Sequence, residues 1–256
     1  MNILYIGSSG ALSLIPFKKL LNSNYSITAV GVFSPVVFDS KIIAFENESL
    51  AFSASQLNIP LIDLSQPIEN IIAQCSEYSI VVILMCCSST RLSAAVIKLA
   101  SKGCLNMHPS LLPGYRGPEP IFWQMKLACD MGVSWHLVTQ DFDAGDIVKQ
   151  NKVMMDDGLN YMQINRMLAK KGADLMLLLL SELAADFLVM YVQNTELASS
   201  CPYPDKQNFS IELTWTAQHA NNFMCETKVL SVGYDCNVGA HHYLLDKAII
   251  NDNNDT

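Results

Sequence analysis

The 256-residue sequence carries little positive charge: 16 Lys and Arg stand against 24 Asp and Glu, and the net charge is −8. Its arginines are Arg91, Arg116 and Arg166, and its adjacent lysine pairs, Lys18-Lys19 and Lys170-Lys171, fit solvated helix faces. A protein that binds nucleic acid normally clusters Lys and Arg to neutralise phosphates. The scarcity of such clusters disfavours a nucleic-acid partner.

Motifs for metal binding, secretion and membrane insertion are missing as well. The eight cysteines form no CxxC pair, and no His/Cys cluster has metal-ligand spacing, so we expect free thiols and no metal. The first residues carry neither the basic region nor the cleavage site of a signal peptide. The apolar run 175–180 is much shorter than the roughly 20 residues that cross a bilayer. These absences favour a cytoplasmic protein without a membrane partner.

Half of the residues are hydrophobic, enough to bury a sizeable core over this length. A run such as Ile80 to Met85, apolar throughout, is typical of a strand in a sheet covered on both faces. Over the first 108 residues, such runs alternate with helical patterns, which predicts an α/β fold with a doubly wound, mostly parallel, Rossmann-like sheet. We predict strands at 3–6, 27–33, 60–64, 80–85 and 104–108, and helices at 11–21, 50–57, 67–75 and 92–100.

The rest of the chain changes character twice. Serine and proline at 199–204 give residues 194–208 the composition of a linker. The predicted division is a catalytic domain at 1–193, the linker at 194–208, and a small, mainly β C-terminal domain at 209–256. The elements expected here are helices at 119–129, 159–192 (with Gly172 a possible break) and 217–225, paired strands at 133–139 and 147–155, and short strands at 229–234 and 242–250.

Asn106 and His108 are the first candidates for chemistry. They lie two residues apart in a predicted strand, so their side chains point to the same face. They also lie at its carboxyl end, where ligands bind in open α/β sheets. The same pattern also fits a purely structural role, in which Asn106 caps a loop and His108 forms hydrogen bonds with the backbone.

The loops that follow strengthen the functional interpretation. Four prolines between positions 109 and 120 stiffen the segment after His108 and exclude a helix or interior strand there. Further along, the turn around Asp143 supplies a carboxylate, although Asp and Gly also favour an ordinary hairpin turn. A carboxylate beside His108 would raise the pKa of the imidazole and favour its charged form. Asn106, His108 and Asp143 would then provide an oxyanion donor, a general acid/base and a charge-stabilising group for acyl transfer.

Two stretches, CLNMHPSLLPGYRGPEPIFWQ at 104–124 and GVSWHLVTQDFDAGDIV at 132–148, resemble the signature of the 10-formyltetrahydrofolate-dependent formyltransferases. This superfamily includes glycinamide ribonucleotide, methionyl-tRNA and sugar-amine formyltransferases. The resemblance implies that Asn106, His108 and Asp143 are catalytic and that 10-formyltetrahydrofolate is the formyl donor.

The resemblance also implies where the donor binds. The family's folate pocket uses the loop before the helix at 92–100, largely through backbone groups, and the turn after the catalytic histidine. The donor-binding residues implied here are Ser89, Thr90, Arg91, Leu92, Ser110, Leu111, Leu112 and Pro113. Cys86-Cys87 stands where many relatives have Tyr-Gly. Adjacent cysteines at the end of an apolar strand favour packing over catalysis.

The segment 203–217 resembles the start of the C-terminal domain of methionyl-tRNA formyltransferases and their sugar-modifying relatives, where Trp215 would be a core anchor. Residues 201–256 contain three lysines and seven acidic residues, a net charge of −4. The segment 33–49, where tRNA-acting relatives carry a long basic insertion, contains one lysine and three acidic residues. Such surfaces repel phosphates, so a small amine such as an amino sugar is favoured over tRNA as the acceptor.

Other interpretations stay open at this point. The chain can be a methionyl-tRNA formyltransferase, a folate- or metabolite-binding protein without activity, or a nicotinamide-dependent oxidoreductase that uses the turn Gly7 to Gly10. That turn is not a GxGxxG motif, and no ribose-binding acid is evident after the second predicted strand. A homodimer is expected by analogy with sugar-acting relatives.

Overall fold

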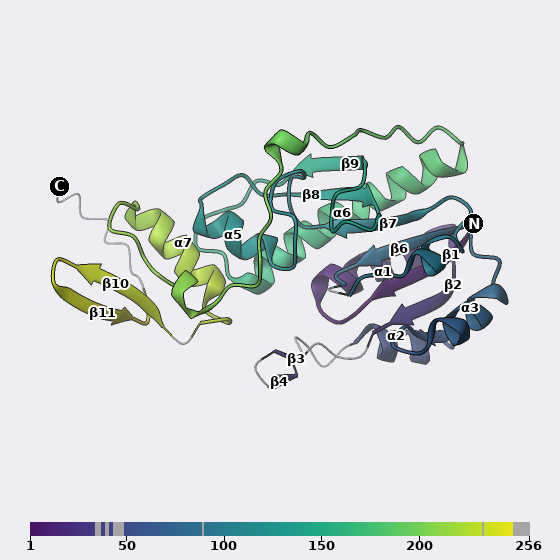
Figure 1. Cartoon of the computed structure of the whole chain (residues 1–256), viewed down its shortest axis with the longest axis horizontal. Coiled ribbons are helices and arrows are strands. Elements are labelled where there is room, and N and C mark those ends of the chain that lie inside the picture. The colour runs from purple at the N-terminus through teal and green to yellow at the C-terminus, as the bar shows by residue number, and fades with distance from the viewer. Residues whose placement is uncertain (34–36, 39–40, 43–48, 89, 232, 248–256) are drawn as a thin grey trace.

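A computed structural model describes residues 1–33, 37–38, 41–42, 49–88, 90–231 and 233–247. Its central feature is a seven-stranded sheet with the strand order β5-β2-β1-β6-β7-β8-β9 (Figure 1). Its strands are β1 (Asn2–Gly7), β2 (Ser26–Val32), β5 (Leu61–Asp63), β6 (Val82–Cys86), β7 (Cys104–His108), β8 (Gly132–Leu137) and β9 (Ile147–Lys152). The first five in sheet order are parallel, and β8 and β9 add antiparallel pairs. The predicted doubly wound, mostly parallel sheet is confirmed. A separate ribbon pairs β3 (Val37–Phe38) with β4 (Lys41–Ile42).

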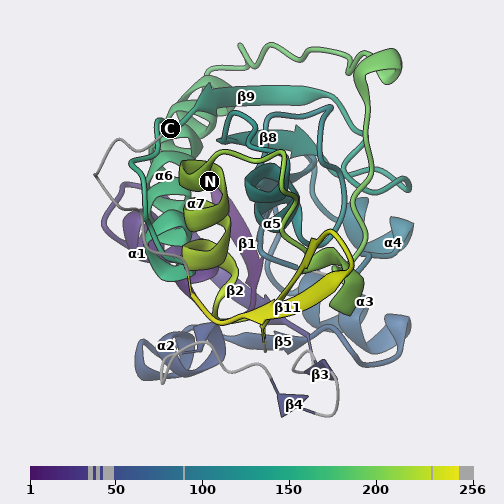
Figure 2. The same cartoon turned by 90° about the vertical axis from the view of Figure 1, so that its left-hand side faces the viewer.

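Helices cover both faces of the sheet (Figure 2). One face packs against α1 (Ala11–Leu21), α2 (Leu50–Gln56) and α6 (Tyr161–Ala184), and the other against α3 (Ile68–Ser76) and α4 (Ala94–Ile97). Every residue of β6 is therefore buried, as its continuous apolar sequence predicts. Among the described helices, none combines the length and apolar character needed to cross a bilayer.

Gly172 does not break α6 but lets the helix approach the sheet. A Cβ at Gly172 would overlap Met107 Sδ, which belongs to the residue between Asn106 and His108 on β7. The Gly172 carbonyl also accepts a hydrogen bond from Trp135 Nε1 of β8 (2.8 Å). The helix is thus fixed directly behind the strands that carry the candidate residues.

Several predicted helices are longer than the observed ones, including the helix predicted at 119–129, which is observed as α5 (Pro120–Lys126). α6 ends at Ala184 rather than 192, because Lys102 Nζ binds the Leu183 carbonyl (2.7 Å) and Asp186 adopts a left-handed backbone conformation (φ 54°). The chain then runs extended and forms a backbone bridge between Tyr191 and Ile147 of β9. α4 covers 94–97 instead of 92–100, since the backbone tightens into three-residue turns after Lys98.

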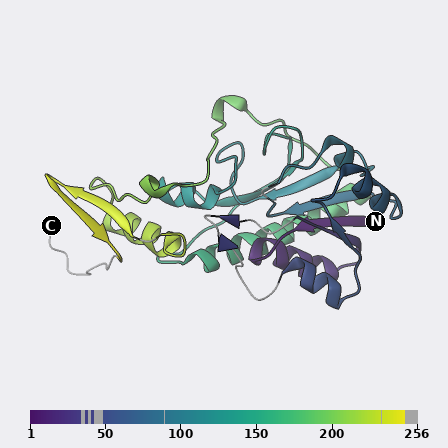
Figure 3. The same cartoon turned by 60° about the horizontal axis from the view of Figure 1, so that its bottom comes forward.

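The C-terminal region lies at one end of the molecule, against α5 (Pro120–Lys126) (Figures 1 and 3). It contains α7 (Ala217–Thr227) and the antiparallel hairpin of β10 (Tyr234–Val238) and β11 (His241–Leu245). Phe122 of α5 packs in a cluster with Phe209, Phe223, Met224 and Tyr234, and Trp215 packs against that cluster as predicted.

Not every prediction for this region is met. The strand predicted at 229–234 begins only at Tyr234, because Leu230 and Ser231 turn back to bond the Thr227 carbonyl. Residues 248–256, which include the end of the strand predicted at 242–250, lie outside the described residues. The domain boundaries after 193 and 208 stay predictions.

Candidate active site

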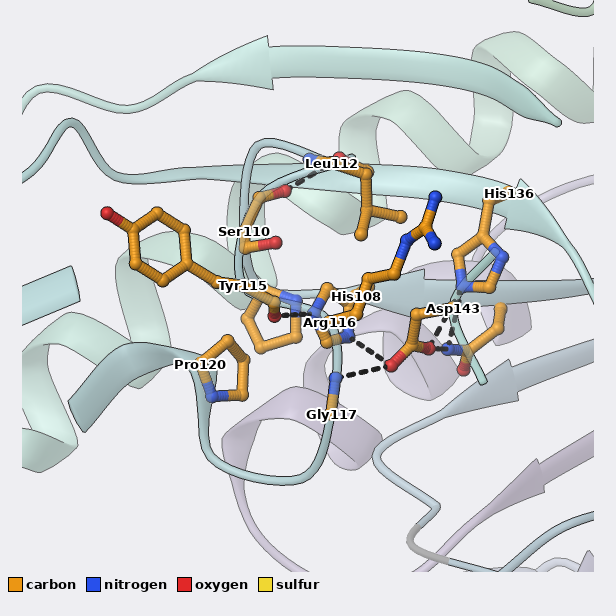
Figure 4. Close-up of polar contacts among 12 residues, drawn as sticks. His108, Ser110, Leu112, Tyr115, Arg116, Gly117, Pro120, His136 and Asp143 are labelled. Atoms are coloured by element: carbon orange, nitrogen blue, oxygen red, sulfur yellow. Dashed lines mark hydrogen bonds and ion pairs between the residues drawn. The ribbon is translucent and has the colours of Figure 1, made fainter. Parts of the chain in front are cut away.

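The carboxyl end of β7 brings the predicted catalytic residues together (Figure 4). The antiparallel strand β8 pairs His136 directly opposite Asn106, and Asn106 Nδ2 lies 3.1 Å from His136 Nε2. Asp143 enters from the turn after β8. Its Oδ1 lies 3.4 Å from Asn106 Nδ2 and 3.3 Å from His136 Nε2, and its Oδ2 lies 3.6 Å from His108 Nδ1. The structure therefore gathers Asn106, His108 and Asp143, with His136 as a fourth member.

The loop 109–118 holds both His108 and Asp143. The backbone N–H of Gly117 donates to Asp143 Oδ2 (2.9 Å). His108 Nε2 lies 2.8 Å from the carbonyl oxygen of Tyr115. Since a carbonyl oxygen only accepts, Nε2 carries the proton, and the other ring nitrogen, Nδ1, faces the Asp143 carboxylate.

Burial and neighbouring groups act in opposite directions on the charge of this pair. Burial lowers the pKa of His108 below its usual 6.5, and the opposing effect of the Asp143 carboxylate is smaller. The carboxylate thus acts in the expected direction, but the expectation of a charged histidine is wrong, because loss of solvation outweighs the attraction. Burial also raises the pKa of Asp143, but His108, His136 and the Gly117 N–H together outweigh it and lower this pKa to about 2. Above pH 6.5, an ionised Asp143 thus lies beside a neutral His108.

The predicted donor-binding turn, Ser110 to Pro113, follows His108 and is fastened to the neighbouring strands. Ser134 Oγ of β8 donates to the Ser110 carbonyl (2.6 Å), and Gln150 Nε2 of β9 donates to the Leu112 carbonyl (2.7 Å). Ser110 Oγ donates to the Gly114 carbonyl (2.8 Å), and the Leu112–Pro113 peptide bond is cis. Hydrogen bonds to β8 and β9 therefore hold the turn in place next to His108.

The other predicted donor-binding segment borders the Asp143 turn. The Arg91 guanidinium stacks on Phe142, with its Cζ 4.3 Å from the ring centroid. Thr90 is exposed, and Leu92 is buried in the core on the α3 and α4 face, which leaves Leu92 only its backbone for a ligand. Ser89 lies outside the described residues, as do positions 34–36, 39–40 and 43–48 of the segment 33–49.

The two cysteines near the site differ: Cys86 is packed in the core, as expected, whereas Cys87 is exposed. Cys86 at the end of β6 is buried, and burial raises the pKa of its thiol, so it is a poor nucleophile. Its backbone carbonyl accepts a hydrogen bond from Ser13 Oγ (2.8 Å), and the Cys87 carbonyl accepts one from Ser8 Oγ (3.1 Å). In the part of the chain that the structure describes, no three His, Cys, Asp or Glu side chains are grouped to hold a metal ion.

Two residues of the site, His136 and Gln193, are not among the sequence predictions. His136 lies in the strand predicted at 133–139, so its place in the sheet is indicated by the sequence. The register that puts it directly opposite Asn106 depends on tertiary structure, and the sequence does not reveal it. For Gln193 the sequence gives no indication of a role, since the helix was predicted to extend up to 192. Its side chain bonds the backbone of Asp143 and the guanidinium of Arg116.

Known proteins resemble the chain in sequence. Residues 20–180 match the family described as formyl transferase. A methionyl-tRNA formyltransferase from a Synechococcus species is 32% identical over 132 residues, which cover 51% of this chain and 41% of that protein. Another from Chlamydia trachomatis is 29% identical over 227 residues, 85% of this chain and 68% of the relative. The chain spans less than two thirds of the length of the first of these curated relatives.

Solved structures share the fold at lower sequence identity. A 4-N formyltransferase from Francisella tularensis superposes with a TM-score of 0.66 at 18% identity and covers 98% of both chains. An N-formyltransferase from Helicobacter canadensis, in complex with folinic acid and dTDP-3-aminofucose, has a TM-score of 0.66 at 14% identity, over 93% of this chain and 84% of that one.

Proposed function

Because the chain belongs to the formyl transferase family, we propose that it transfers a formyl group from 10-formyltetrahydrofolate to the primary amine of a small molecule. The convergence of Asn106, His108 and Asp143 at the carboxyl end of β7 carries this proposal. The Helicobacter canadensis structure, which holds folinic acid and an amino sugar nucleotide in the same fold, supports a folate donor and a sugar-amine acceptor.

In the proposed reaction, the unprotonated amine attacks the formyl carbon, and the carbonyl oxygen becomes an oxyanion. The tetrahedral intermediate then collapses as the bond between the formyl carbon and N10 of the folate breaks. The products are a formamide and tetrahydrofolate. The amine loses one proton and N10 gains one, so a group in the site that takes up and returns a proton accelerates both steps.

His108 is the proposed carrier of this proton. With Nε2–H donated to Tyr115, Nδ1 is the basic position of the neutral ring, 3.6 Å from Asp143 Oδ2. That distance is too long for a hydrogen bond in the resting site, but the carboxylate stabilises the imidazolium that forms when Nδ1 is protonated. Asp143 thereby compensates for the burial that lowers the pKa of His108.

Asn106 is the proposed donor to the oxyanion. Its Nδ2 makes a 3.1 Å contact with His136 and a longer, 3.4 Å contact with Asp143. The longer one is the weaker bond, so it is the one that a formyl oxygen bearing negative charge would replace. The fixed turn Ser110 to Pro113 and the backbone of Thr90 to Leu92 are the proposed contacts of the folate.

A small amine is proposed over tRNA because of charge. The chain carries a net charge of −8, and residues 201–256 contribute three lysines against seven acidic residues. A tRNA acceptor needs many phosphate contacts with Lys and Arg. The names of the Synechococcus and Chlamydia trachomatis relatives favour tRNA as the second candidate.

An acceptor screen tests both levels of the proposal. The protein is incubated with 10-formyltetrahydrofolate and either nucleotide-linked amino sugars or charged initiator tRNA, and the formylated product is identified by mass spectrometry. We expect a formamide on an amino sugar and none on the tRNA. Formylation of the tRNA alone would refute the small-molecule acceptor, and no formylated product with any amine would refute formyl transfer.

Paired histidine variants test the mechanism. We expect His108→Ala to lower kcat by roughly 10²–10⁴-fold, the usual contribution of a general acid/base. The control is His242→Ala, because His242 lies on the C-terminal hairpin with an exposed side chain. Equal rates for the two variants would rule out His108 as the proton carrier.

A further inference from the structure

Gln193 is a buried amide, 5% exposed, in the extended segment that follows α6. Its Nε2 donates to the backbone carbonyl oxygens of Asp143 (2.8 Å) and Gly145 (2.7 Å). Its Oε1 accepts from Nε (3.1 Å) and Nη2 (2.6 Å) of Arg116. Both the donor and the acceptor ends of the amide are thus engaged, each with a different loop.

These two loops hold the catalytic pair. Arg116 lies between Tyr115, whose carbonyl oxygen binds His108, and Gly117, whose N–H binds Asp143. Figure 4 shows Tyr115, Arg116 and Gly117 on one loop that passes His108 and reaches the Asp143 carboxylate. A side chain that ties Arg116 to the Asp143 turn therefore sets the separation of that turn from His108.

The Asp143 turn depends on such a tie. Asp143 has a φ of 52°, in the left-handed region that residues with a side chain seldom adopt. At Gly145 a Cβ would overlap the Leu137 carbonyl oxygen, so the turn is packed tightly against the end of β8. Without the Gln193 amide, the carbonyl groups of Asp143 and Gly145 would each lose a donor in a buried position.

We propose that Gln193 is a positioning residue for formyl transfer, which fixes the Asp143 carboxylate relative to His108 by tying the Asp143 turn to Arg116. The inference rests on the proposed function, since the pair it orients is the proposed proton carrier and its stabilising anion. A glutamine suits this place because the turn needs two donors and Arg116 needs an acceptor. Glutamate would keep the contact with Arg116 but would point an oxygen at the two carbonyl groups.

Two variants separate these contacts. Gln193→Met removes both contacts without adding charge, and Gln193→Glu keeps the acceptor for Arg116 but puts a charged oxygen in place of the donors to the Asp143 turn. For both we expect kcat to fall roughly 10- to 100-fold, because a displacement of about 1 Å at a reacting centre costs up to about 100-fold. The KM values for donor and amine should change less than about threefold. Val192→Ala is the control, because Val192 is 84% exposed next to Gln193, and it should match the parent.

A second measurement distinguishes positioning from general destabilisation. NMR titration of His108 in Gln193→Met should give a pKa below that of the parent, because the Asp143 carboxylate that raises it has moved away. Rates are normalised to the folded fraction from thermal unfolding. Normalised kcat values and a His108 titration equal to those of the parent would overturn the proposal. A parent protein that formylates no amine would instead overturn the proposed function, while the NMR shift would still decide whether Gln193 places Asp143.

Discussion

Replacing Glu226 by Gln should stabilise the protein, and by an amount that grows with pH. Glu226 lies on α7, is fully buried, and neither of its carboxylate oxygens has a hydrogen-bond partner among the described residues. Burial, and to a smaller extent the neighbouring Glu119, raises the pKa of Glu226 to about 8. Burial also raises the pKa of Glu119 to about 7. Helix α7 therefore buries a carboxyl group that is costly to ionise.

The sign and size of the effect follow from proton linkage. Between the ordinary pKa of 4.5 and the native value of about 8, the folded protein binds more protons at Glu226 than the unfolded chain does. The free energy of unfolding of the parent therefore falls as pH rises through this window. At about 1.4 kcal/mol for each pH unit of this window, the loss above pH 8 is on the order of several kcal/mol. Glutamine does not titrate, so Glu226→Gln avoids this loss.

Urea denaturation at about pH 5 and about pH 8 measures the difference. We expect the variant to exceed the parent by less than about 1 kcal/mol at the lower pH and by several kcal/mol at the higher one. Glu77→Gln is the control, because Glu77 is exposed at the end of α3 and should show no such trend. An equal difference at both pH values, or a variant less stable than the parent at the higher pH, would show that Glu226 is not a buried, unpartnered carboxyl group.

Further predictions concern the site and the helix behind it. Asp143→Asn should lower kcat by roughly 10²-fold or more. It should also move the acid limb of the kcat/KM profile to lower pH, because the carboxylate that raises the His108 pKa is removed. An acid limb that moves to higher pH would contradict this. Asn106→Ala should lower kcat by roughly 10²–10³-fold with little change in the donor KM, as expected for loss of an oxyanion donor. Gly172→Ala should lower the free energy of unfolding by about 1–3 kcal/mol in urea denaturation, because its Cβ would overlap Met107 Sδ; an equally stable variant would show that α6 moves away from β7 at little cost.

The features that sequence patterns predict well are those fixed by local periodicity. The alternation of strands and helices gives α1 at 11–21 and β7 at 104–108 with their observed boundaries. Asn106 and His108 follow from the two-residue repeat of a strand, and Asp143 from a turn after the next predicted strand. In each case the information lies within a few residues, so a single sequence contains it.

What the sequence does not reveal depends on long-range contacts. Residues 185–192 are apolar enough to continue the helical pattern of α6, but Lys102 closes the helix and Ile147 of β9 pairs with Tyr191 instead. Because the chain leaves the helix and runs beside β9, Gln193 lies against the Asp143 turn. His136 likewise becomes part of the site only through the antiparallel register of β7 and β8. The sequence also does not reveal the charge of His108, because burial depends on the folded structure. In the site, the effect of burial on the His108 pKa outweighs that of the nearby carboxylate.

This burial bears directly on the proposed chemistry. Formyl transfer to an amine needs an unprotonated nucleophile and a group that can take up its proton. Removal of water lowers the pKa of a cationic acid, so a dry site favours the neutral form of His108 and of a bound amine alike. A charged His108 would be an anion-stabilising group but could not accept the proton. Asp143 remains ionised in the same site because His108, His136 and the Gly117 N–H together outweigh its loss of solvation. In the proposed reaction the site thus keeps its negative charge on the carboxylate beside the histidine, and Nδ1 of that histidine stays basic when the amine attacks.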